Sequence, residues 1–205
     1  MKKLLSLLLT MLLLLTAASA EFDFYALKEL DDHLVYTMPG TANTVVRALT
    51  PPYEGTLGED EMIAYLDYVI LPDEDVTTFR LCLSVSLFDS IQADSVTVTV
   101  DKKQYTFTDV MLESTEYDGI YMEDYSLILS DASYPIVTAL AKGKSSVTLD
   151  VVFENAADGI SRSGSVTIAG SDVAAMVEQY NELGGKEQDL SVLAEKYPCK
   201  VEKVK

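Results

Sequence analysis

Histidine is nearly absent from this chain, which limits the chemistry that its side chains can perform. His33 is the only histidine among 205 residues, so it is the one ordinary candidate for a base that works near neutral pH. No G-x-S-x-G nucleophile motif accompanies it. A single histidine and two distant cysteines do not have the spacing of zinc ligands, and no glycine-rich loop indicates phosphate binding. The sequence therefore favours a protein that is not an enzyme and that holds no cofactor.

Basic side chains are scarce too. The chain contains 15 lysines and arginines against 33 acidic residues, which gives a net charge of −18 at pH 7. A surface this negative repels nucleic-acid phosphates and anionic membranes, so neither is expected as a partner. High negative charge also keeps a protein soluble, which is the simplest interpretation. Cationic ligands, and weak binding of calcium by clustered carboxylates, remain compatible with this composition.

Tryptophan is absent and cysteine is rare. Without tryptophan, the chain lacks the cysteine–tryptophan–cysteine core of antibody domains. Its two cysteines, Cys82 and Cys199, permit one disulfide in an exported protein, with two separate thiols as the alternative. A disulfide here would close a long loop and would contribute about 4–5 kcal/mol by restricting the unfolded chain.

Long hydrophobic runs are missing except at the start of the chain. Residues 1–20 combine two early lysines, an apolar stretch from Leu4 to Leu15 and the small-x-small sequence Ala18-Ser19-Ala20, which is the pattern of a secretory signal peptide. The apolar stretch is shorter than the about 20 residues that span a bilayer. Glu21, not cysteine, follows, which argues against a lipid anchor. We therefore expect cleavage after Ala20 and a secreted, extracellular chain without a membrane partner.

The remaining residues, 21–205, predict a single β-rich domain. Its expected parts are an irregular N-terminal segment (21–60), a strand-rich core (61–169) and a C-terminal helical segment (170–205). Within the first part, 33–38 and 44–49 resemble short strands on either side of a Pro39-Gly40 turn.

Side-chain polarity alternates with a period of two through most of the core. In residues 76–88, every second residue from Phe79 to Leu87 is apolar, whereas Arg80 and Cys82 fall between them. This alternation is typical of a strand with one buried face. The same pattern recurs in 94–100, 105–107, 125–129, 146–153 and 160–168.

Two or three short helices are also expected. Residues 133–143 begin with a capping serine and a proline, and residues 171–183 begin with a serine and end at Gly184-Gly185. Asp189 can cap a third helix over residues 190–197. Many short strands with few helices predict a mainly β fold, specifically an antiparallel, immunoglobulin-like β-sandwich. A partly open β-barrel with a helical cap is the alternative.

Residues 113–126, ESTEYDGIYMEDYS, hold five carboxylates and three tyrosines. Asp118-Gly119 predicts a turn, so the stretch is expected to form a hairpin tip. Ile120 and Met122 are out of phase with the apolar residues that follow, which predicts a bulge. Tyrosine suits recognition because it combines a flat apolar ring with a polar group. The predicted binding residues are Tyr117, Asp118, Tyr121, Glu123 and Tyr125.

These features favour a noncatalytic binding module that recognises a protein or an extracellular glycan. Two alternatives stay open. One is a hydrolase with an acidic cleft, similar in principle to glycoside hydrolases, because 33 acidic residues allow many carboxylate pairs. The other is an accessory subunit of a cell-surface assembly that pairs through its edge strands.

Overall fold

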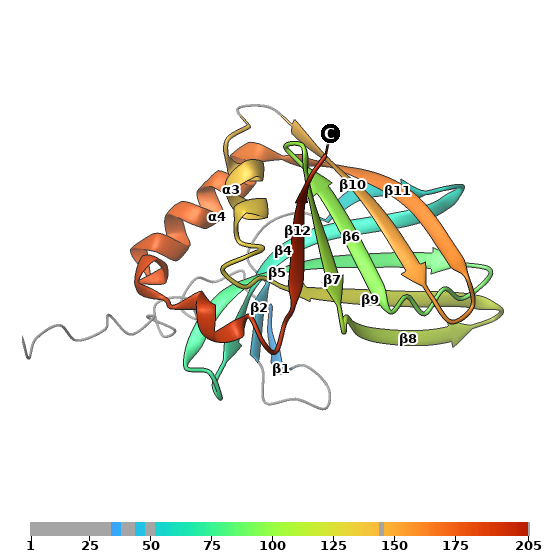
Figure 1. Ribbon diagram of the computed structural model, residues 1–205, viewed down its shortest axis with the longest axis horizontal. Coiled ribbons are helices and arrows are strands. Elements are labelled where there is room, and N and C mark those ends of the chain that lie inside the picture. The colour runs from blue at the N-terminus through green and yellow to red at the C-terminus, as the bar shows by residue number, and fades with distance from the viewer. Residues whose placement is uncertain (1–33, 38–43, 48–51, 144–145, 205) are drawn as a thin grey trace, which may run out of the picture.

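The computed structural model describes residues 34–37, 44–47, 52–143 and 146–204 (Figure 1). The predicted signal peptide, residues 1–20, and His33 lie outside these residues. The described strands are β1 (Leu34–Thr37), β2 (Thr44–Arg47), β3 (Tyr53–Leu57), β4 (Asp60–Leu71), β5 (Val76–Leu87), β6 (Ser95–Val100), β7 (Lys103–Thr108), β8 (Met111–Tyr117), β9 (Ile120–Ile128), β10 (Ser146–Asn155), β11 (Ile160–Ala169) and β12 (Cys199–Lys203). The described helices are α3 (Pro135–Ala141) and α4 (Gly170–Glu182), with short 3₁₀ helices η1 (Gly185–Glu187) and η2 (Leu190–Leu193).

All described strands belong to one antiparallel sheet. Its order is β12-β7-β6-β10-β11-β3-β4-β5-β9-β8, and β2 joins β1 to β4 beside this path. The end strands, β12 and β8, do not pair with each other, so the sheet is not closed into a barrel. The mainly β prediction is confirmed. The immunoglobulin-like sandwich is not confirmed, because the hydrogen-bonded path between the described strands runs through one continuous sheet.

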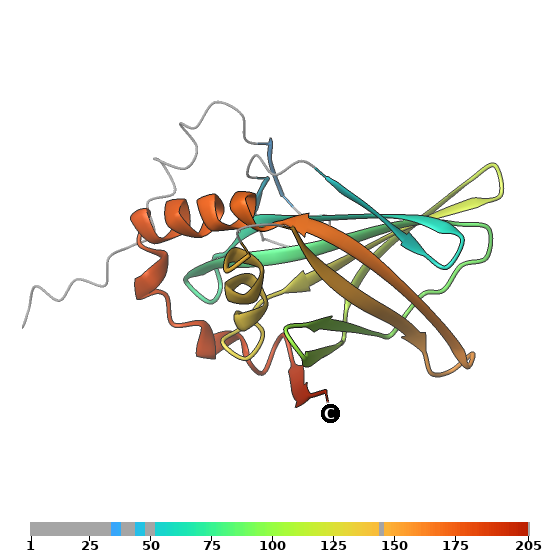
Figure 2. The same cartoon turned by 90° about the horizontal axis from the view of Figure 1, so that it is seen from above.

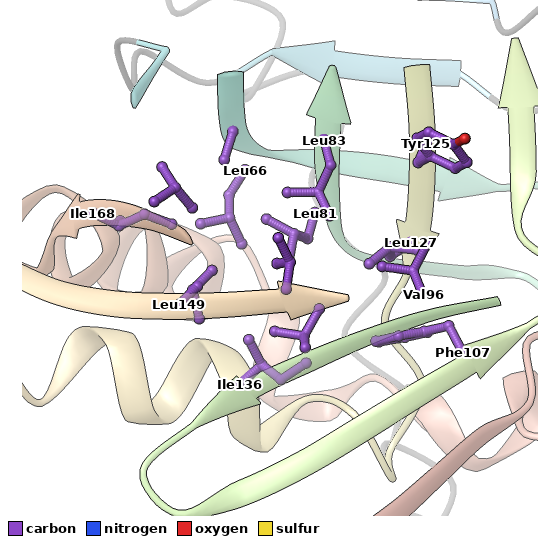
Figure 3. Packing of buried hydrophobic residues seen from close by; sticks show 14 of the residues in the cluster. Leu66, Leu81, Leu83, Val96, Phe107, Tyr125, Leu127, Ile136, Leu149 and Ile168 are labelled. Carbon is purple, nitrogen blue, oxygen red and sulfur yellow. The ribbon is translucent and has the colours of Figure 1, made fainter. Parts of the chain in front are cut away.

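The core lies between two parts of this sheet. The alternating side chains of β5 from Phe79 to Leu87 are buried, as their polarity predicts. Tyr125 of β9 packs against Phe153 of β10 with ring centroids 4.8 Å apart, although β9 and β10 are not neighbours in the sheet. Figure 3 shows side chains of β4, β5 and β9 meeting those of β6, β7, β10 and β11. The sheet therefore bends until one face packs on itself.

The helices cover one end of this core, at the left of Figures 1 and 2. The hydroxyl of Tyr68 donates to the carbonyl of Met176 in α4 at 2.6 Å, and that of Tyr180 donates to the carbonyl of Thr77 at 2.7 Å. Burial raises the pKa of both phenols well above the ordinary value for tyrosine. In the described part of the chain, no helix combines the length and the apolar character that spanning a membrane requires.

The predicted helix caps are partly wrong. Tyr134 and Ala169 are the N-cap residues of α3 and α4, in place of Ser133 and Ser171. At neither position does the side chain form a capping hydrogen bond with the helix backbone. The hydroxyl oxygen of Ser133 instead accepts from the backbone N–H of Ser130, because the chain turns before the helix starts. Asp189 caps η2 as predicted, but this helix is a 3₁₀ helix that ends at Leu193 and does not continue to residue 197.

Strands β3 and β11 form the junction between the two halves of the sheet, and two glycines lie there. Gly55 pairs with Val166, and Gly164 pairs with Leu57. A Cβ atom on Gly164 would overlap the carbonyl oxygen of Thr56 and would lie 2.9 Å from Cα of Leu57. The junction therefore needs glycine at position 164.

We expect Gly164→Ala to lower the free energy of unfolding by about 2–3 kcal/mol, because the added methyl group forces the strands apart. Urea unfolding measures the change. The control is Ser163→Ala, on the neighbouring exposed side chain, which should change stability by no more than about 0.5 kcal/mol. Equal urea midpoints for Gly164→Ala and Ser163→Ala would contradict the claim that the contact between β3 and β11 requires glycine at position 164.

Candidate functional site

The stretch from 113 to 126 forms most of the β8–β9 hairpin, as predicted. Tyr117 pairs with Ile120 across a two-residue turn. In this turn Asp118 has φ 54° and Gly119 has φ 79°, the left-handed values of a type I′ turn. The pairing continues without interruption along β9, so the predicted bulge is wrong. Ile120 breaks the apolar phase because its side chain is exposed on the outer face of the sheet.

The hairpin divides the five predicted binding residues into two groups. Tyr117 and Asp118 are exposed at the tip, and Tyr121 is half-buried. Glu123 and Tyr125 are buried on the inner face. The first group is accessible to a partner, whereas the second group contacts the protein's own interior.

Buried Glu123 binds the loop between β5 and β6. Its carboxylate accepts from the hydroxyl of Ser90 at 2.5 Å, from the backbone N–H of Ile91 at 3.0 Å and from that of Gln92 at 3.2 Å. The hydroxyl of Tyr125 donates to the same carboxylate. A buried carboxylate is tolerated when such donors satisfy it. Glu123 therefore anchors the loop to the hairpin.

Two further side chains hold the same loop. Tyr125 accepts a hydrogen bond from the backbone N–H of Ala93 at 3.1 Å. Burial, and then its hydrogen bond to Glu123, raise the pKa of Tyr125 far above the ordinary value. The amide nitrogen of Asn155 donates to the carbonyls of Ile91 and Gln92 at 3.1 and 3.0 Å. The loop is thus held from both β9 and β10.

The loop after β5 begins with an exposed aromatic residue, Phe88. Leu87 pairs with Tyr121 at the end of β5, and Phe88 is the next residue along the chain. On the other side of β9, Tyr117 pairs with Ile120. Phe88 and Tyr117 are each 76% exposed. Tyr117 and Ile120 therefore lie side by side at this end of the sheet, and Phe88 directly follows the neighbouring strand β5.

A fourth exposed apolar side chain lies on the same face of β9 as Ile120. Met122 pairs with Ser86 on one side and with Thr115 on the other, and it is 46% exposed. Residues in neighbouring strands at such positions are about 5 Å apart. We call this surface the outer cluster; it consists of Phe88, Tyr117, Ile120 and Met122.

Carboxylates surround the outer cluster. Exposed acidic residues on the surrounding strands and turns are Glu61, Asp89, Glu113, Glu116, Asp118 and Asp124. The sequence contains no lysine or arginine from residue 104 to 141. Among the residues that the structure describes, no three side chains of His, Cys, Asp or Glu converge to hold a metal ion. The expected weak calcium binding stays a prediction.

A separate groove of about 500 Å³ lies between α3 and α4. Its carboxylates, Glu178 and Glu182, project from one helix four residues apart, and Lys186 lies beside them. A glycoside hydrolase needs two carboxyl groups on either side of the scissile bond. These two instead lie on the same wall of the groove.

The sequence allows either a disulfide between the two cysteines or two separate thiols. Cys82 and Cys199 are both free thiols. Cys82 lies in β5 on the outer face of the sheet, whereas Cys199 lies in β12 opposite buried Phe107 and packs against the inner core. The two thiols therefore belong to different faces of distant strands. Burial raises the pKa of both, that of Cys199 to about 12.

Glu123 was predicted as a binding residue, and its inward position has a sequence signal. It shares the parity of Tyr121, Tyr125 and Leu127, whose side chains face the interior of the sheet. If an acidic residue at such a position faces the interior, hydrogen-bond donors must satisfy its carboxylate; otherwise the strand must depart from the two-residue alternation there. The loop residues that bind it, Ser90 to Gln92, have no comparable signal.

We expect Glu123→Gln to lower the free energy of unfolding by about 2–4 kcal/mol, because the amide cannot accept all four hydrogen bonds of the carboxylate. Chemical denaturation measures the loss, and amide hydrogen exchange should become faster at Ile91 and Gln92. The control is Asp124→Asn on the exposed side of the same strand, where Ser84 is the hydrogen-bond partner. A similar change in both variants would show that the buried contacts do not hold the loop.

The unusual surface features gather at the end of the sheet opposite the helices, where the β8–β9 turn lies in Figures 1 and 2. No protein-family model matches this chain, and comparison with curated proteins and with solved structures gives no match. The geometry of the chain itself is therefore the basis for assigning a function.

Proposed function

We propose that the protein is a secreted, noncatalytic binding module that recognises another protein through the outer cluster. The observation that carries this proposal is the exposure of two aromatic side chains, Phe88 after the end of β5 and Tyr117 at the end of β8. Aromatic anchors contribute much of the energy at protein interfaces. The surrounding carboxylates correspond to the polar rim of such an interface. The signal-peptide pattern of residues 1–20 supports the extracellular location.

The held loop supports the same proposal. Binding costs less free energy when the contacting groups are already ordered in the free protein. Phe88 lies in the loop that Glu123, Tyr125 and Asn155 hold through the hydrogen bonds described above. Tyr117 flanks a type I′ turn, which fixes the hairpin backbone. We therefore propose that the surface is preorganised for binding.

We also infer that the bent sheet acts as a sandwich-like scaffold. The contact of Tyr125 with Phe153 across the core supports this inference. In β-sandwiches, loops and turns at the ends of the layers commonly carry recognition. The β8–β9 turn and the β5–β6 loop lie at such an end.

The test compares binding by the wild-type protein with binding by the triple variant Phe88→Ser, Tyr117→Ser and Met122→Ser. Peptides are selected from a random phage-displayed library on the immobilised wild type, and a panel of glycans is screened in parallel. Selected peptides should bind the triple variant at least about tenfold more weakly, because the apolar anchors are gone.

The matched control replaces exposed apolar side chains elsewhere on the molecule, in Val192→Ser and Val204→Ser. It should change affinity by no more than about twofold. Equal binding to the wild type and to the triple variant would remove the outer cluster from the site. Glycans that bind in place of peptides, with the same loss in the triple variant, would change the ligand class.

A further inference from the structure

Strand β8 is one of the two ends of the sheet, and the structure describes no strand on its outer side. Figure 1 shows it along the lower edge of the molecule. From Glu113 to Tyr117 its side chains are exposed on both faces. An edge of this kind offers unpaired backbone N–H and C=O groups to another strand.

The turn determines which backbone groups are available. In a two-residue hairpin, the residues that flank the turn form a hydrogen-bonded pair, and such pairs then alternate with non-hydrogen-bonded ones. Tyr117 flanks the turn, so Thr115 and Glu113 also bond to β9. Ser114 and Glu116 therefore direct their N–H and C=O groups away from the sheet.

The charge along this edge indicates what can occupy it. Glu113 and Glu116 lie on opposite faces of β8, and Asp118 follows in the turn. Residues 104–141 contain no basic side chain that would neutralise them, and the whole chain carries a net charge of −18. A strand added here places its side chains beside these carboxylates. Lysine or arginine in the added strand is favoured for this reason.

We propose that the edge of β8 accepts an extended, basic segment of a partner protein as an additional strand of the sheet. This inference rests on the proposed function and names the partner's chemistry at the same site. Backbone hydrogen bonds to Ser114 and Glu116 supply the strand pairing. On the outer face the added side chains lie next to Glu113 and Tyr117, where a cation can also contact the aromatic ring.

A second copy of the chain fits this edge less well. Pairing of two β8 strands would bring Glu113 and Glu116 of both chains onto one short ladder. Like charges placed opposite each other in a ladder are destabilising, and the net charge of each chain adds long-range repulsion. The basic segment avoids both costs.

The other end strand, β12, provides an internal comparison. The backbone N–H of Val204 donates to the carbonyl of Lys102 at 3.0 Å, so Val201, three residues earlier, directs its own N–H away from β7. This edge is also open among the described strands, but it carries Lys200 and Lys203. We expect no binding of a basic segment there.

The experiment uses the seven-residue peptide Lys-Val-Lys-Val-Lys-Val-Lys, which matches the length of β8. Its affinity for the protein is measured by fluorescence anisotropy at low salt. Ser114→Pro removes one outward N–H without removing a hydrogen bond to β9. This variant should bind the peptide at least about tenfold more weakly. Ser114→Ala keeps the N–H and should bind within about twofold of the wild type.

Two controls separate strand pairing from simple charge attraction. Val201→Pro makes the same backbone change at the basic edge and should leave the affinity within about twofold. A peptide of the same sequence with every amide N-methylated keeps its charge but has no N–H groups. It should bind the wild-type protein at least about tenfold more weakly. This second comparison needs no variant, so it holds even if Ser114→Pro does not fold.

The outcomes distinguish this inference from the proposed function. Strand addition would be overturned if the wild-type protein bound the N-methylated peptide as tightly as the unmodified peptide. It would also be overturned if the unmodified basic peptide did not bind at all. If library peptides still lose affinity for the outer-cluster variant in that case, the proposed function stands. Dimers that form without peptide and that Ser114→Pro abolishes would overturn the basic partner in favour of a second copy.

Discussion

The arrangement of the sheet depends on the close contact between β3 and β11. This junction joins the two halves of the sheet through three residue pairs, and glycine is required where Gly164 meets Leu57. The sheet bends so that one face packs on itself, and Tyr125 meets Phe153 across the core. The same bend encloses Glu123 on the inner face. The close contact of β3 with β11 therefore joins the two halves of the sheet that contribute to this core.

Enclosing Glu123 has consequences for the surface. A carboxylate removed from water must accept hydrogen bonds, and the β5–β6 loop supplies them through Ser90, Ile91 and Gln92. The same loop carries the exposed side chain of Phe88. For the binding that we propose, this interior polar contact would order part of the apolar surface in advance and lower the entropy lost on binding. The edge of β8, which pairs with no further strand among the described residues, adds backbone groups to the same region, so the recognition that we propose combines side-chain and main-chain contacts.

Much of the secondary structure follows from the sequence, because the two-residue period reports which side chains share a face. It predicted the buried face of β5, and Asp118-Gly119 predicted the hairpin turn. It did not predict a single sheet, because alternation shows that one face is covered and not which strands cover it. The strand β3 was missed because it lies in the segment 21–60 that we expected to be irregular, where Pro51-Pro52 and Gly55 are typical of a loop. The inward role of Glu123 depends on donors from a distant loop, which no local pattern reports.

Amide hydrogen exchange by NMR, with and without the basic peptide, tests the central claim most directly, that a held hairpin offers an open edge. In the free protein, the amides of Ile91 and Thr115 should exchange slowly, and those of Ser114 and Glu116 should exchange fast. The peptide should slow exchange at Ser114 and Glu116 and leave Thr115 unchanged, which is the alternation of strand pairing. Uniform or absent protection along β8, or fast exchange at Ile91 in the free protein, would contradict the account.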